Sequence, residues 1–337
     1  MQVLKQKLID VIQQDIPIQE NPFQWIAEQL NTDLDNVFEL LKALKQEGIL
    51  RQIAPIYDTK SLGYQSGLAA VAVEDNDIEK AVYILNEHPG VSHNYLRNDT
   101  FNIWFTIAIP PDSRIGLEET IRILIKEIGT NIKYVILNTK RVFKINTRFM
   151  QDAKEMMKRE DFVDPKIFSG RLDEIDKYII RETQYDLPIV DKPFHDIANR
   201  LDLGVDILIE KLFKYKEQGI MRRFSGLINH RKAGFNANGM SVWIVPEDKI
   251  EEYGKIMASF KGVTHCYERT TNEFWRYNLF CMIHGKDEKE VYDTVYAIQQ
   301  TLGDKIPFKV LFSSKEFKKT RLRYFEDDYY RWEDRYI

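Results

Sequence analysis

The residues best suited to chemistry gather in one basic stretch, MRRFSGLINHRKAGF (Met221 to Phe235). It contains four cations, one titratable imidazole and one aromatic ring, namely Arg222, Arg223, Arg231 and Lys232, His230, and Phe224. Guanidinium groups match the geometry of carboxylates, and imidazole transfers protons near neutral pH. The stretch therefore suits a ligand that bears several carboxylates. A basic surface loop would have the same composition, so these residues alone leave both interpretations open.

A second candidate motif alternates histidine, tyrosine and arginine along one expected strand. In GVTHCYER these residues are His265, Tyr267 and Arg269. Every second side chain of a strand lies on the same face, so the three form a row. Burying an unpaired charge beneath helices is costly. We therefore expect the row to face a cleft lined by paired sheets, on the side away from the helices.

The same row occurs in the first half of the chain, as His93, Tyr95 and Arg97. It belongs to an internal repeat, in which DIPIQENPFQWIAEQL (15–30) matches DLPIVDKPFHDIANRL (186–201) and PGVSHNYLR (89–97) matches KGVTHCYER (261–269). Two copies of one long unit in the same order indicate a duplication and exclude a short-period solenoid.

The two copies are unequal at the basic stretch. Where the second copy has Arg223, Phe224 and His230, the first has Gln52, Ile53 and Thr59. The first copy thus keeps the alternating row and lacks the basic turn. Either one composite site draws on both halves, or the second half is catalytic and the first is a scaffold. We favour the second half as catalytic, and expect Arg269→Ala to weaken ligand binding more than Arg97→Ala.

Hydrophobic periodicity predicts the elements that position these residues. Apolar residues at helical spacing indicate three helices in the first copy, at 3–13, 23–30 and 34–46, in a helix-turn-helix pattern. A βαββαβ order follows, with strands at 68–73, 91–96, 103–109 and 134–137 and helices at 78–87 and 116–128. We predict an α+β protein with two tandem copies of a helix-turn-helix unit followed by a βαββαβ ferredoxin-like domain.

The repeat also predicts the domain boundaries. The expected segments are a first helix-turn-helix-like unit (1–50), a first ferredoxin-like domain (51–145), a connector (146–172), a second helix-turn-helix-like unit (173–223), a second ferredoxin-like domain (224–325) and a C-terminal tail (326–337).

Composition narrows the class of protein. The chain has 337 residues, a net charge of −4 and a pI near 6.0, so it has no overall attraction for nucleic acid or anionic membranes. Its two cysteines, Cys266 and Cys281, form no metal-binding spacing, which argues against a structural metal and fits a reducing cytoplasm. No apolar run reaches the roughly 20 residues of a membrane span.

A small helix-turn-helix followed by a βαββαβ domain resembles the Lrp/AsnC transcription regulators, as does the junction GILRQIAPIYDTKSLGY (48–64). DNA recognition needs cations and amides at the leading turn of the recognition helix. Here LDNVFELLKALKQ carries Asp35 and Glu39, and VDILIEKLFKYKEQ carries Asp206 and Glu210. Acids would face phosphate, so we expect no specific DNA binding.

A more specific resemblance is to the sirohaem decarboxylases, which are Lrp/AsnC relatives. MRRFSGLINHRKAGF, GVTHCYER, FWRYNLFCMIHG (274–285) and EFKKTRLRYF (316–325) are similar to the second subunit of that family. HPGVSHNYLR with NIWFTIAIP (88–97, 102–110) is similar to the first subunit. The chain thus resembles both subunits joined head to tail. The resemblance implies removal of two acetate carboxylates from sirohaem, giving 12,18-didecarboxysirohaem.

Such a substrate is a flat macrocycle ringed with carboxylates, so its site needs cations at a rim and aromatic walls. The candidate rim residues are Arg222, Arg223, Arg231, Lys232 and Arg269, and the candidate walls are Phe224, Trp243, Trp275 and Tyr277. His230, His265 and Tyr267 are the candidate catalytic groups, because decarboxylation ends in delivery of a proton. His93, Tyr95 and Arg97 are further candidate binding residues.

Several alternatives stay open at this point. We expect no cofactor of the protein's own, since the iron belongs to the sirohaem, but a histidine could ligate that iron. A haem-sensing regulator and a transcription factor that binds an amino acid are the alternatives from other classes. The sequence does not decide whether the product feeds haem or the denitrifiers' haem, nor whether the fused chain forms a homodimer.

Overall fold

The computed structural model describes residues 2–145, 153–163, 166–229, 237–303 and 305–337. The chain forms two compact units, and each unit is built from both copies of the repeat. Unit 1 comprises Met1–Tyr64, Lys166–Ala233 and Arg323–Glu326, and unit 2 comprises Gln65–Pro165, Gly234–Leu322 and Asp327–Ile337.

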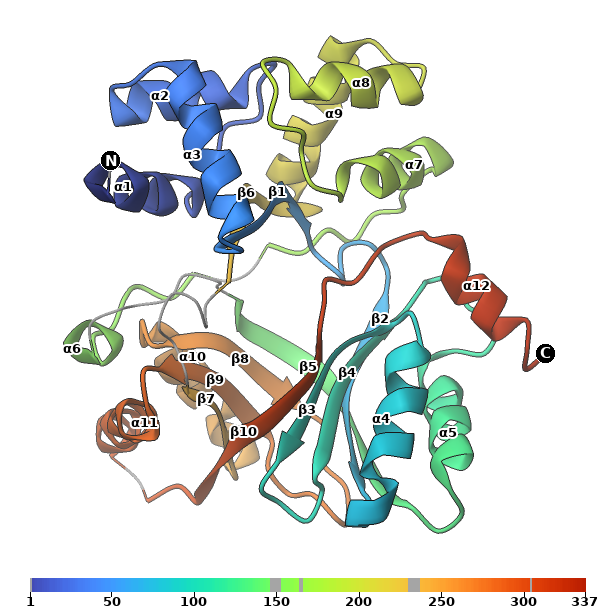
Figure 1. Ribbon diagram of the computed structural model, residues 1–337. Helices are drawn as coiled ribbons and strands as arrows, with labels where there is room; N and C mark the ends of the chain where they lie inside the picture. Colours follow the sequence, from blue (N-terminus) through green and yellow to red (C-terminus); the bar gives the residue numbers. More distant parts are fainter. Residues whose placement is uncertain (1, 146–152, 164–165, 230–236, 304) are drawn as a thin grey trace. The chain divides into compact units, whose positions relative to one another are not determined.

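Unit 1 contains the two helix-turn-helix-like segments (Figure 1). Its helices are α1 (Gln2–Ile12), α2 (Pro22–Leu30), α3 (Leu34–Gln46), α7 (Glu174–Thr183), α8 (Pro193–Arg200) and α9 (Val205–Gln218). The local sequence explains where they begin. The Asn21 side chain accepts from the N–H of Gln24 at the start of α2, and Asp33 accepts from Asn36 at the start of α3. The three helices predicted for the first copy are confirmed.

Unit 1 also holds a two-stranded antiparallel ribbon, made of β1 (Leu50–Tyr57) and β6 (Met221–Ile228). The expectation of a basic turn from residue 221 is therefore wrong for its first eight residues, which form strand β6. Main-chain hydrogen bonds from the connectors between helices hold both strands of this ribbon. Ile16 donates to the carbonyl of Phe224, and Leu187 donates to the carbonyl of Ile53, each at 2.7 Å. Each copy's helix connector thus binds a strand of the other copy.

Unit 2 is a closed eight-stranded barrel with the order β10-β3-β4-β2-β5-β8-β9-β7. The first copy supplies β2 (Gln65–Ala72), β3 (Val91–Arg97), β4 (Ile103–Ile109) and β5 (Lys133–Ile145), and the second supplies β7 (Ala237–Trp243), β8 (Val263–Arg269), β9 (Leu279–Gly285) and β10 (Phe308–Lys319). The strand predicted at 134–137 is longer than expected, because β5 continues to Ile145.

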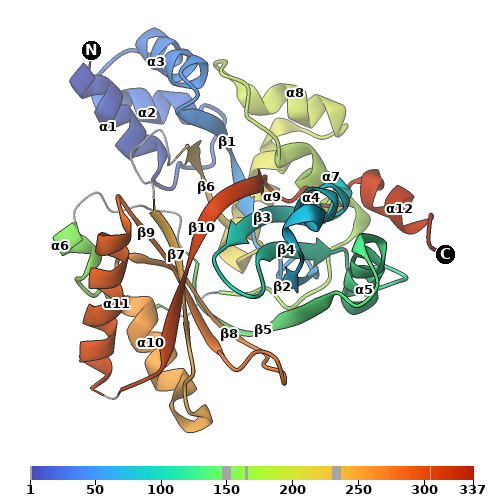
Figure 2. The same ribbon diagram turned by 60° about the horizontal axis from the view of Figure 1, so that its bottom comes forward.

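The last strand of each copy joins the two halves of the barrel. Strand β5 pairs with β2 of its own copy and with β8 of the other copy. Strand β10 likewise pairs with β7 of its own copy and with β3 of the other, as Figure 2 shows. No barrel strand is left with an unpaired edge, since the two exchanges close the sheet.

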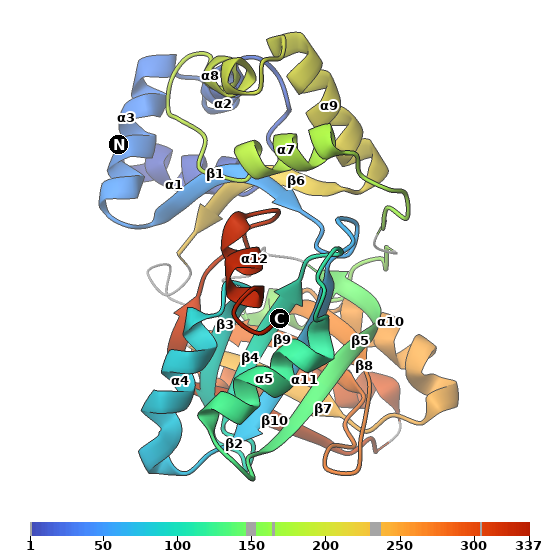
Figure 3. The same ribbon diagram turned by 90° about the vertical axis from the view of Figure 1, so that its right-hand side faces the viewer.

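Helices cover the outside of the barrel (Figure 3). Helices α4 (Ile78–Glu87) and α5 (Leu117–Ile128) pack on the first-copy strands through a core that includes Phe105 and Ile121. Helices α10 (Ile250–Ser259) and α11 (Glu288–Leu302) pack on the second-copy strands through a core that includes Trp243 and Cys281. Short helical segments α6 (Ala153–Met156), η1 (Asp75–Asp77) and η2 (Glu247–Lys249) complete this layer.

A third apolar cluster lies on the opposite, inner face of the strands. Its members include Leu68, Trp104, Leu137, Phe280 and Leu311, and they come from both copies. The barrel interior is therefore partly filled by side chains that the two halves contribute together. None of the helices in the described part of the chain has the length and hydrophobicity of a membrane span.

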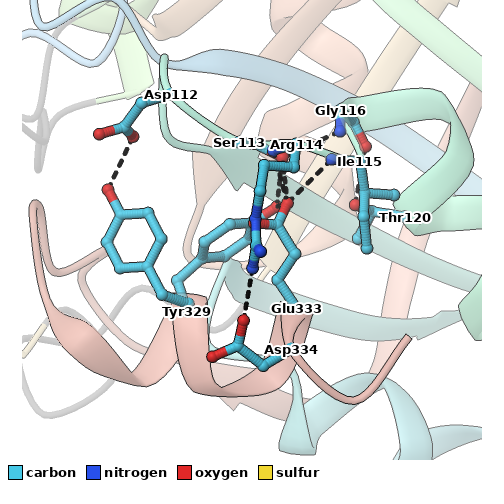
Figure 4. Close-up of polar contacts among 10 residues, drawn as sticks. Asp112, Ser113, Arg114, Ile115, Gly116, Thr120, Tyr329, Glu333 and Asp334 are labelled. Atoms are coloured by element: carbon cyan, nitrogen blue, oxygen red, sulfur yellow. Dashed lines mark hydrogen bonds and ion pairs between the residues drawn. The ribbon is translucent and has the colours of Figure 1, made fainter. Parts of the chain in front are cut away.

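The chain ends in helix α12 (Asp327–Glu333), which docks on unit 2 (Figure 4). The buried Glu333 carboxylate accepts hydrogen bonds from the Ser113 hydroxyl and from the main-chain N–H groups of Arg114 and Ile115, at 2.7, 2.9 and 2.9 Å. Trp332 packs edge-on against His88, with 4.2 Å between ring centroids. The tail therefore docks on its own domain through contacts that include a buried carboxylate and an indole.

Candidate functional site

The two alternating rows lie on the inner face of the barrel. The residues between them point outward to the helices: Cys266 Sγ lies 3.7 Å from the carbonyl of Gly254 in α10, and the Asn94 amide donates to Asn86 in α4 at 3.0 Å. Alternate side chains take opposite faces, so both His-x-Tyr-x-Arg rows point away from the helices. The structure thus confirms that the rows lie on the side of the strands away from the helices, while the cleft itself stays a prediction.

The arginines that end the rows are buried and held by the other copy. Arg97 Nη1 donates to the carbonyl of Leu311 at 2.5 Å, and Arg269 Nη1 donates to the carbonyl of Leu137 at 3.1 Å. Arg269 Nη1 also lies 3.0 Å from Thr139 Oγ1. Arg269 is only 8% exposed and lies inside the barrel. Burial lowers the pKa of each guanidinium to about 10, which keeps both cationic at neutral pH.

Each buried arginine retains one donor that no described residue accepts. The Nε atoms of Arg97 and Arg269 are both buried, and within the described part of the chain neither has a hydrogen-bond partner. Leaving a charged donor unsatisfied inside a protein costs free energy, and native proteins rarely do so without a reason. A ligand oxygen inside the barrel would satisfy these two donors.

The histidine and tyrosine rings of the two rows lie in similar arrangements. The ring centroids of His93 and Tyr95 are 6.2 Å apart, and those of His265 and Tyr267 are 6.0 Å apart. In both histidines Nδ1 contacts a neighbouring hydroxyl, from Ser92 at 3.0 Å in the first row and from Thr264 at 3.1 Å in the second. A hydroxyl of its own strand thus helps to hold each imidazole in place.

Aromatic side chains pack beside the rows. Trp275 is buried in the inner cluster, with its ring centroid 5.0 Å from those of Trp104 and Tyr277. Its Nε1 is a further buried donor without a partner among the described residues. Trp243 belongs to the outer core beneath the helices. Trp275 and Tyr277 are thus placed to form a wall inside the barrel, and Trp243 is not.

The candidates on strand β6 belong to unit 1 and make contacts there. Arg222 forms an ion pair with the buried Asp58. Arg223 Nη1 lies 3.5 Å from the carbonyl of Gln13. Phe224 is 1% exposed and packs against Phe194, so its burial assigns it to the core of unit 1 and not to a ligand wall. His230, Arg231 and Lys232 lie outside the described residues.

The strand exchange brings further side chains next to the rows. Residues directly opposite in an antiparallel pair share a face. Three residues of β10 oppose the first row, as Ser313↔Arg97, Glu316↔Tyr95 and Lys319↔His93. Three residues of β5 oppose the second row, as Thr139↔Arg269, Val142↔Tyr267 and Ile145↔His265. These neighbours are not predictable from the sequence, because nothing local reveals which strand the end of each copy joins.

Comparison with known proteins defines the class. The AsnC-like ligand binding domain model matches residues 61–144 and 232–318, and the siroheme decarboxylase NirDL-like HTH domain model matches residues 5–51 and 176–222. Both models match twice, once in each copy of the repeat. The chain is thus an AsnC-like protein in which a helix-turn-helix segment and a ligand-binding domain are each duplicated, which confirms the predicted fold class.

The relatives define the family more narrowly. The siroheme decarboxylase of Hydrogenobacter thermophilus is 41% identical over 97% of this chain and 96% of its own. The siroheme decarboxylase NirDL subunit of Paracoccus pantotrophus is 30% identical over 95% of this chain and 96% of its own. The chain belongs to the siroheme decarboxylase family, as the motifs in its sequence indicated.

Two solved structures share the fold along nearly the whole chain. The crystal structure of the siroheme decarboxylase NirDL has 38% sequence identity and a TM-score of 0.76, and covers 98% of this chain and 97% of its own. The same enzyme in complex with an iron-uroporphyrin III analogue has 38% identity and a TM-score of 0.74, covering 97% and 96%. The second structure shows that this relative accommodates an iron tetrapyrrole.

Proposed function

We propose that this chain is a carboxy-lyase that removes two acetate carboxylates from sirohaem to give 12,18-didecarboxysirohaem. The names of its full-length relatives support the reaction, and the relative with an iron-uroporphyrin III analogue supports the class of ligand. The observation in this molecule that supports it best is the pair of buried arginines, Arg97 and Arg269, whose Nε donors no described residue accepts. A substrate with many carboxylates would satisfy both.

Binding would use the inner face of the barrel in unit 2. The guanidinium groups of Arg97 and Arg269 would each donate to a carboxylate, in a setting where little water competes. Trp275 and Tyr277 would contact the face of the macrocycle, since a tetrapyrrole ring is flat and largely apolar. The fixed main-chain contacts of the two arginines orient them before the ligand arrives.

The chemistry needs no oxidant. The bond between the acetate methylene carbon and its carboxylate breaks, and carbon dioxide leaves without the bonding electron pair. That pair stays with the methylene carbon, is delocalised into the pyrrole system and is then protonated, so each acetate becomes a methyl group. Imidazole or phenol groups of the rows, His93, Tyr95, His265 and Tyr267, are the candidates for delivering the proton.

Further residues enter the proposal from the sequence alone. His230 is proposed as a further acid–base group, with Arg231 and Lys232 as cations for carboxylates. Arg222 and Arg223 are proposed as additional binding residues, although both contact groups of unit 1. The proposed reaction uses no cofactor of the protein's own, because the iron is part of the substrate.

The proposal also covers the location, the partners and the oligomeric state of the enzyme. A cytoplasmic location is supported by Cys266 and Cys281, which are buried free thiols with their sulfur atoms 3.6 Å apart. We propose sirohaem as the partner molecule and no specific DNA. We include a homodimer of the fused chain in the proposal, because a chain that contains both halves can still pair with a second copy of itself.

One anaerobic experiment tests the proposal. Sirohaem is added to the purified protein, visible spectra are followed, and the tetrapyrrole is then analysed by mass spectrometry. We expect a product that has lost two carbon dioxide units. Spectral binding with an unchanged mass would favour the haem-sensing alternative, and no binding at all would contradict the proposal.

A further inference from the structure

The two inner-face rows are equivalent in sequence but have unlike neighbours. Beside the first row, strand β10 places Glu316 opposite Tyr95 and Lys319 opposite His93. On its other side, strand β4 places Thr106 opposite His93, and the Thr106 hydroxyl lies 3.4 Å from the imidazole Nδ1. The first row is therefore flanked on both sides by groups that bear charge or form hydrogen bonds.

The second row has apolar neighbours at the same positions. Strand β5 places Val142 opposite Tyr267 and Ile145 opposite His265. On the other side, strand β9 places Met282 opposite His265. Met282 packs against the inner apolar cluster. The duplication has thus diverged at the neighbours of the rows, while the rows themselves have stayed the same.

Contacts on the outer face confirm which side chains of β10 and β5 point inward. Lys318 donates to the carbonyls of Asn86 and His88, on the helix side of the sheet. Lys144 likewise donates to the carbonyl of Phe260 on the outside. Lys318 opposes the outward-facing Asn94, so Glu316 and Lys319, which oppose the inward-facing row, lie on the inner face.

We propose that the first row, completed by Glu316 and Lys319 of the second copy, is where the reacting acetate is held and protonated, and that the apolar-flanked second row contributes Arg269, which holds another carboxylate of the same macrocycle. This inference rests on the proposed function and assigns the site within it. It makes the site composite, because the row comes from one copy and the flanking charges come from the other. It also differs from the sequence-based preference for the second half.

The reason is the cost of placing carboxylates in apolar surroundings. At the second row a carboxylate would have Arg269 as its cation and Val142, Ile145 and Met282 as neighbours, so part of its lost hydration would not be replaced. At the first row Arg97 and Lys319 supply two cations. Glu316 adds a carboxyl group that can take up or release a proton beside Tyr95. Binding and proton delivery are therefore both better served at the first row.

Matched variants separate the two rows. Lys319→Met is compared with Ile145→Met, because the two positions correspond in the repeat and oppose His93 and His265 respectively. Glu316→Gln is compared with Val142→Ala for the same reason. Each variant is titrated with iron uroporphyrin III, followed by visible spectroscopy, and is assayed for carbon dioxide loss from sirohaem. Thermal unfolding shows whether each variant is folded.

We expect Lys319→Met to weaken iron-uroporphyrin binding about 10- to 100-fold, as loss of a charge-assisted hydrogen bond does. Glu316→Gln should keep binding within a few-fold and slow turnover about 100-fold. The Ile145→Met and Val142→Ala proteins should bind and turn over like the wild type. If Lys319→Met failed to fold, Lys319→Gln would take its place in the same comparison.

Two results would overturn the assignment: unchanged binding by Lys319→Met, or a loss in Ile145→Met and Val142→Ala as large as in the first-row variants. Failure of the proposed function gives a different outcome. In that case wild-type protein would leave sirohaem unconverted, while the iron-uroporphyrin titrations would still show which row contributes more to binding the tetrapyrrole.

Discussion

Arg97 donates from Nη1 to the main-chain oxygen of Leu311, a residue 214 positions later in the chain, at 2.5 Å. The equivalent bond joins Arg269 to Leu137, 132 positions earlier, at 3.1 Å. Each row thus ends in a guanidinium that the opposite copy fixes. The orientation of both arginines depends on the exchange of β5 and β10, so the inner face is complete only when the two halves are assembled.

Replacing these arginines by methionine should separate their effects on the ligand. Arg97→Met should weaken iron-uroporphyrin binding by about 10-fold or more, because a carboxylate loses a charged donor. Arg269→Met should weaken it less, since its row has apolar flanks. The sequence alone favours the opposite order. Titration by visible spectroscopy decides between them, with circular dichroism as the check on folding, and a larger loss at Arg269 would return the site to the second row.

His230→Ala tests the basic stretch that the sequence singled out. A general acid–base group typically contributes about 10²- to 10⁴-fold to the rate, so turnover of sirohaem should fall by that order. Thr59, at the corresponding position of the first copy, donates to or accepts from the hydroxyl of Tyr324 at 2.8 Å. Thr59→Ala is the matched control and should retain activity. Normal turnover by the His230→Ala protein would exclude a catalytic role.

His88 should make the protein sensitive to acid. Burial, together with the nearby charges of Lys318 and Arg335, lowers the pKa of His88 to about 3. Its Nδ1 accepts from the N–H of Gly90 at 3.0 Å, and its ring packs against Trp332 and Tyr329. An unfolded histidine titrates near 6.5. Above that pH the residue does not affect the pH dependence of stability. Below it the unfolded state gains a proton that the folded state excludes.

The expected loss of stability is about 1.4 kcal/mol per pH unit once the pH is well below 6.5, and it continues down toward the folded pKa. Denaturant unfolding between pH 7 and pH 4 measures the slope. His88→Asn preserves an acceptor for the Gly90 N–H and removes the titration, so its slope should be smaller by about that amount. Parallel slopes for the two proteins would rule out this role.

Glu333 should anchor the C-terminal helix. Burial by itself would raise the pKa of this carboxyl group, but donors from Ser113, Ile115 and Arg114 outweigh burial and lower the pKa below its ordinary value. Its contribution to stability is therefore present above the unfolded pKa and is lost as the pH falls. Glu333→Gln should destabilise the protein by about 1–3 kcal/mol at neutral pH, because the buried hydrogen bonds to the charged carboxylate are lost.

The neighbouring Asp334 provides the control. It also pairs with Arg114, but its side chain is 62% exposed, so Asp334→Asn should change stability by less than about 1 kcal/mol. Urea unfolding of both variants gives the comparison. Equal effects of the two substitutions would mean that burial of the Glu333 carboxylate does not strengthen its contacts.

The helix-turn-helix segments should bind no specific DNA. The exposed residues of α9 include three acids, Asp206, Glu210 and Glu217, and two large apolar side chains, Ile207 and Phe213. The three lysines of α9, Lys211, Lys214 and Lys216, only balance these acids, so the helix offers phosphate no net attraction. Gel retardation of promoter fragments at physiological salt is the measurement. Retardation that only a particular sequence competes away would contradict the prediction.

The repeated motifs were enough to predict the helices and the βαββαβ order of each copy, but not the ribbon of β1 and β6. Capping residues such as Asn21 and Asp33 and the hydrophobic period are local signals, and the helices of unit 1 follow them. Strand β6 was missed because its arginines and the residues after it resemble a basic turn. In the structure this segment pairs with β1 as a strand, and the pairing buries Met221, Phe224 and Ile228.

The site was only partly predictable, for a physical reason. The spacing of His265, Tyr267 and Arg269 fixes a common face, because side chains of a strand alternate. Whether that face borders Val142 or Glu316 depends on pairing between residues more than a hundred positions apart. Either copy could have closed on its own last strand with the same hydrophobic pattern. Glu316 and Lys319 therefore became candidates only once the register was known.

The exchange of last strands also affects how the molecule responds to dilution. Two separate halves would have to meet in solution, so the completed inner face would disappear when their concentration fell below the dissociation constant. When the halves are joined in one chain, the effective concentration of one half around the other is about millimolar, whatever the amount of protein present. Fusion thus makes completion of the barrel a unimolecular event and fixes the ratio of the two halves at one to one. Expression level would change how many sites exist, and not what fraction of them is complete.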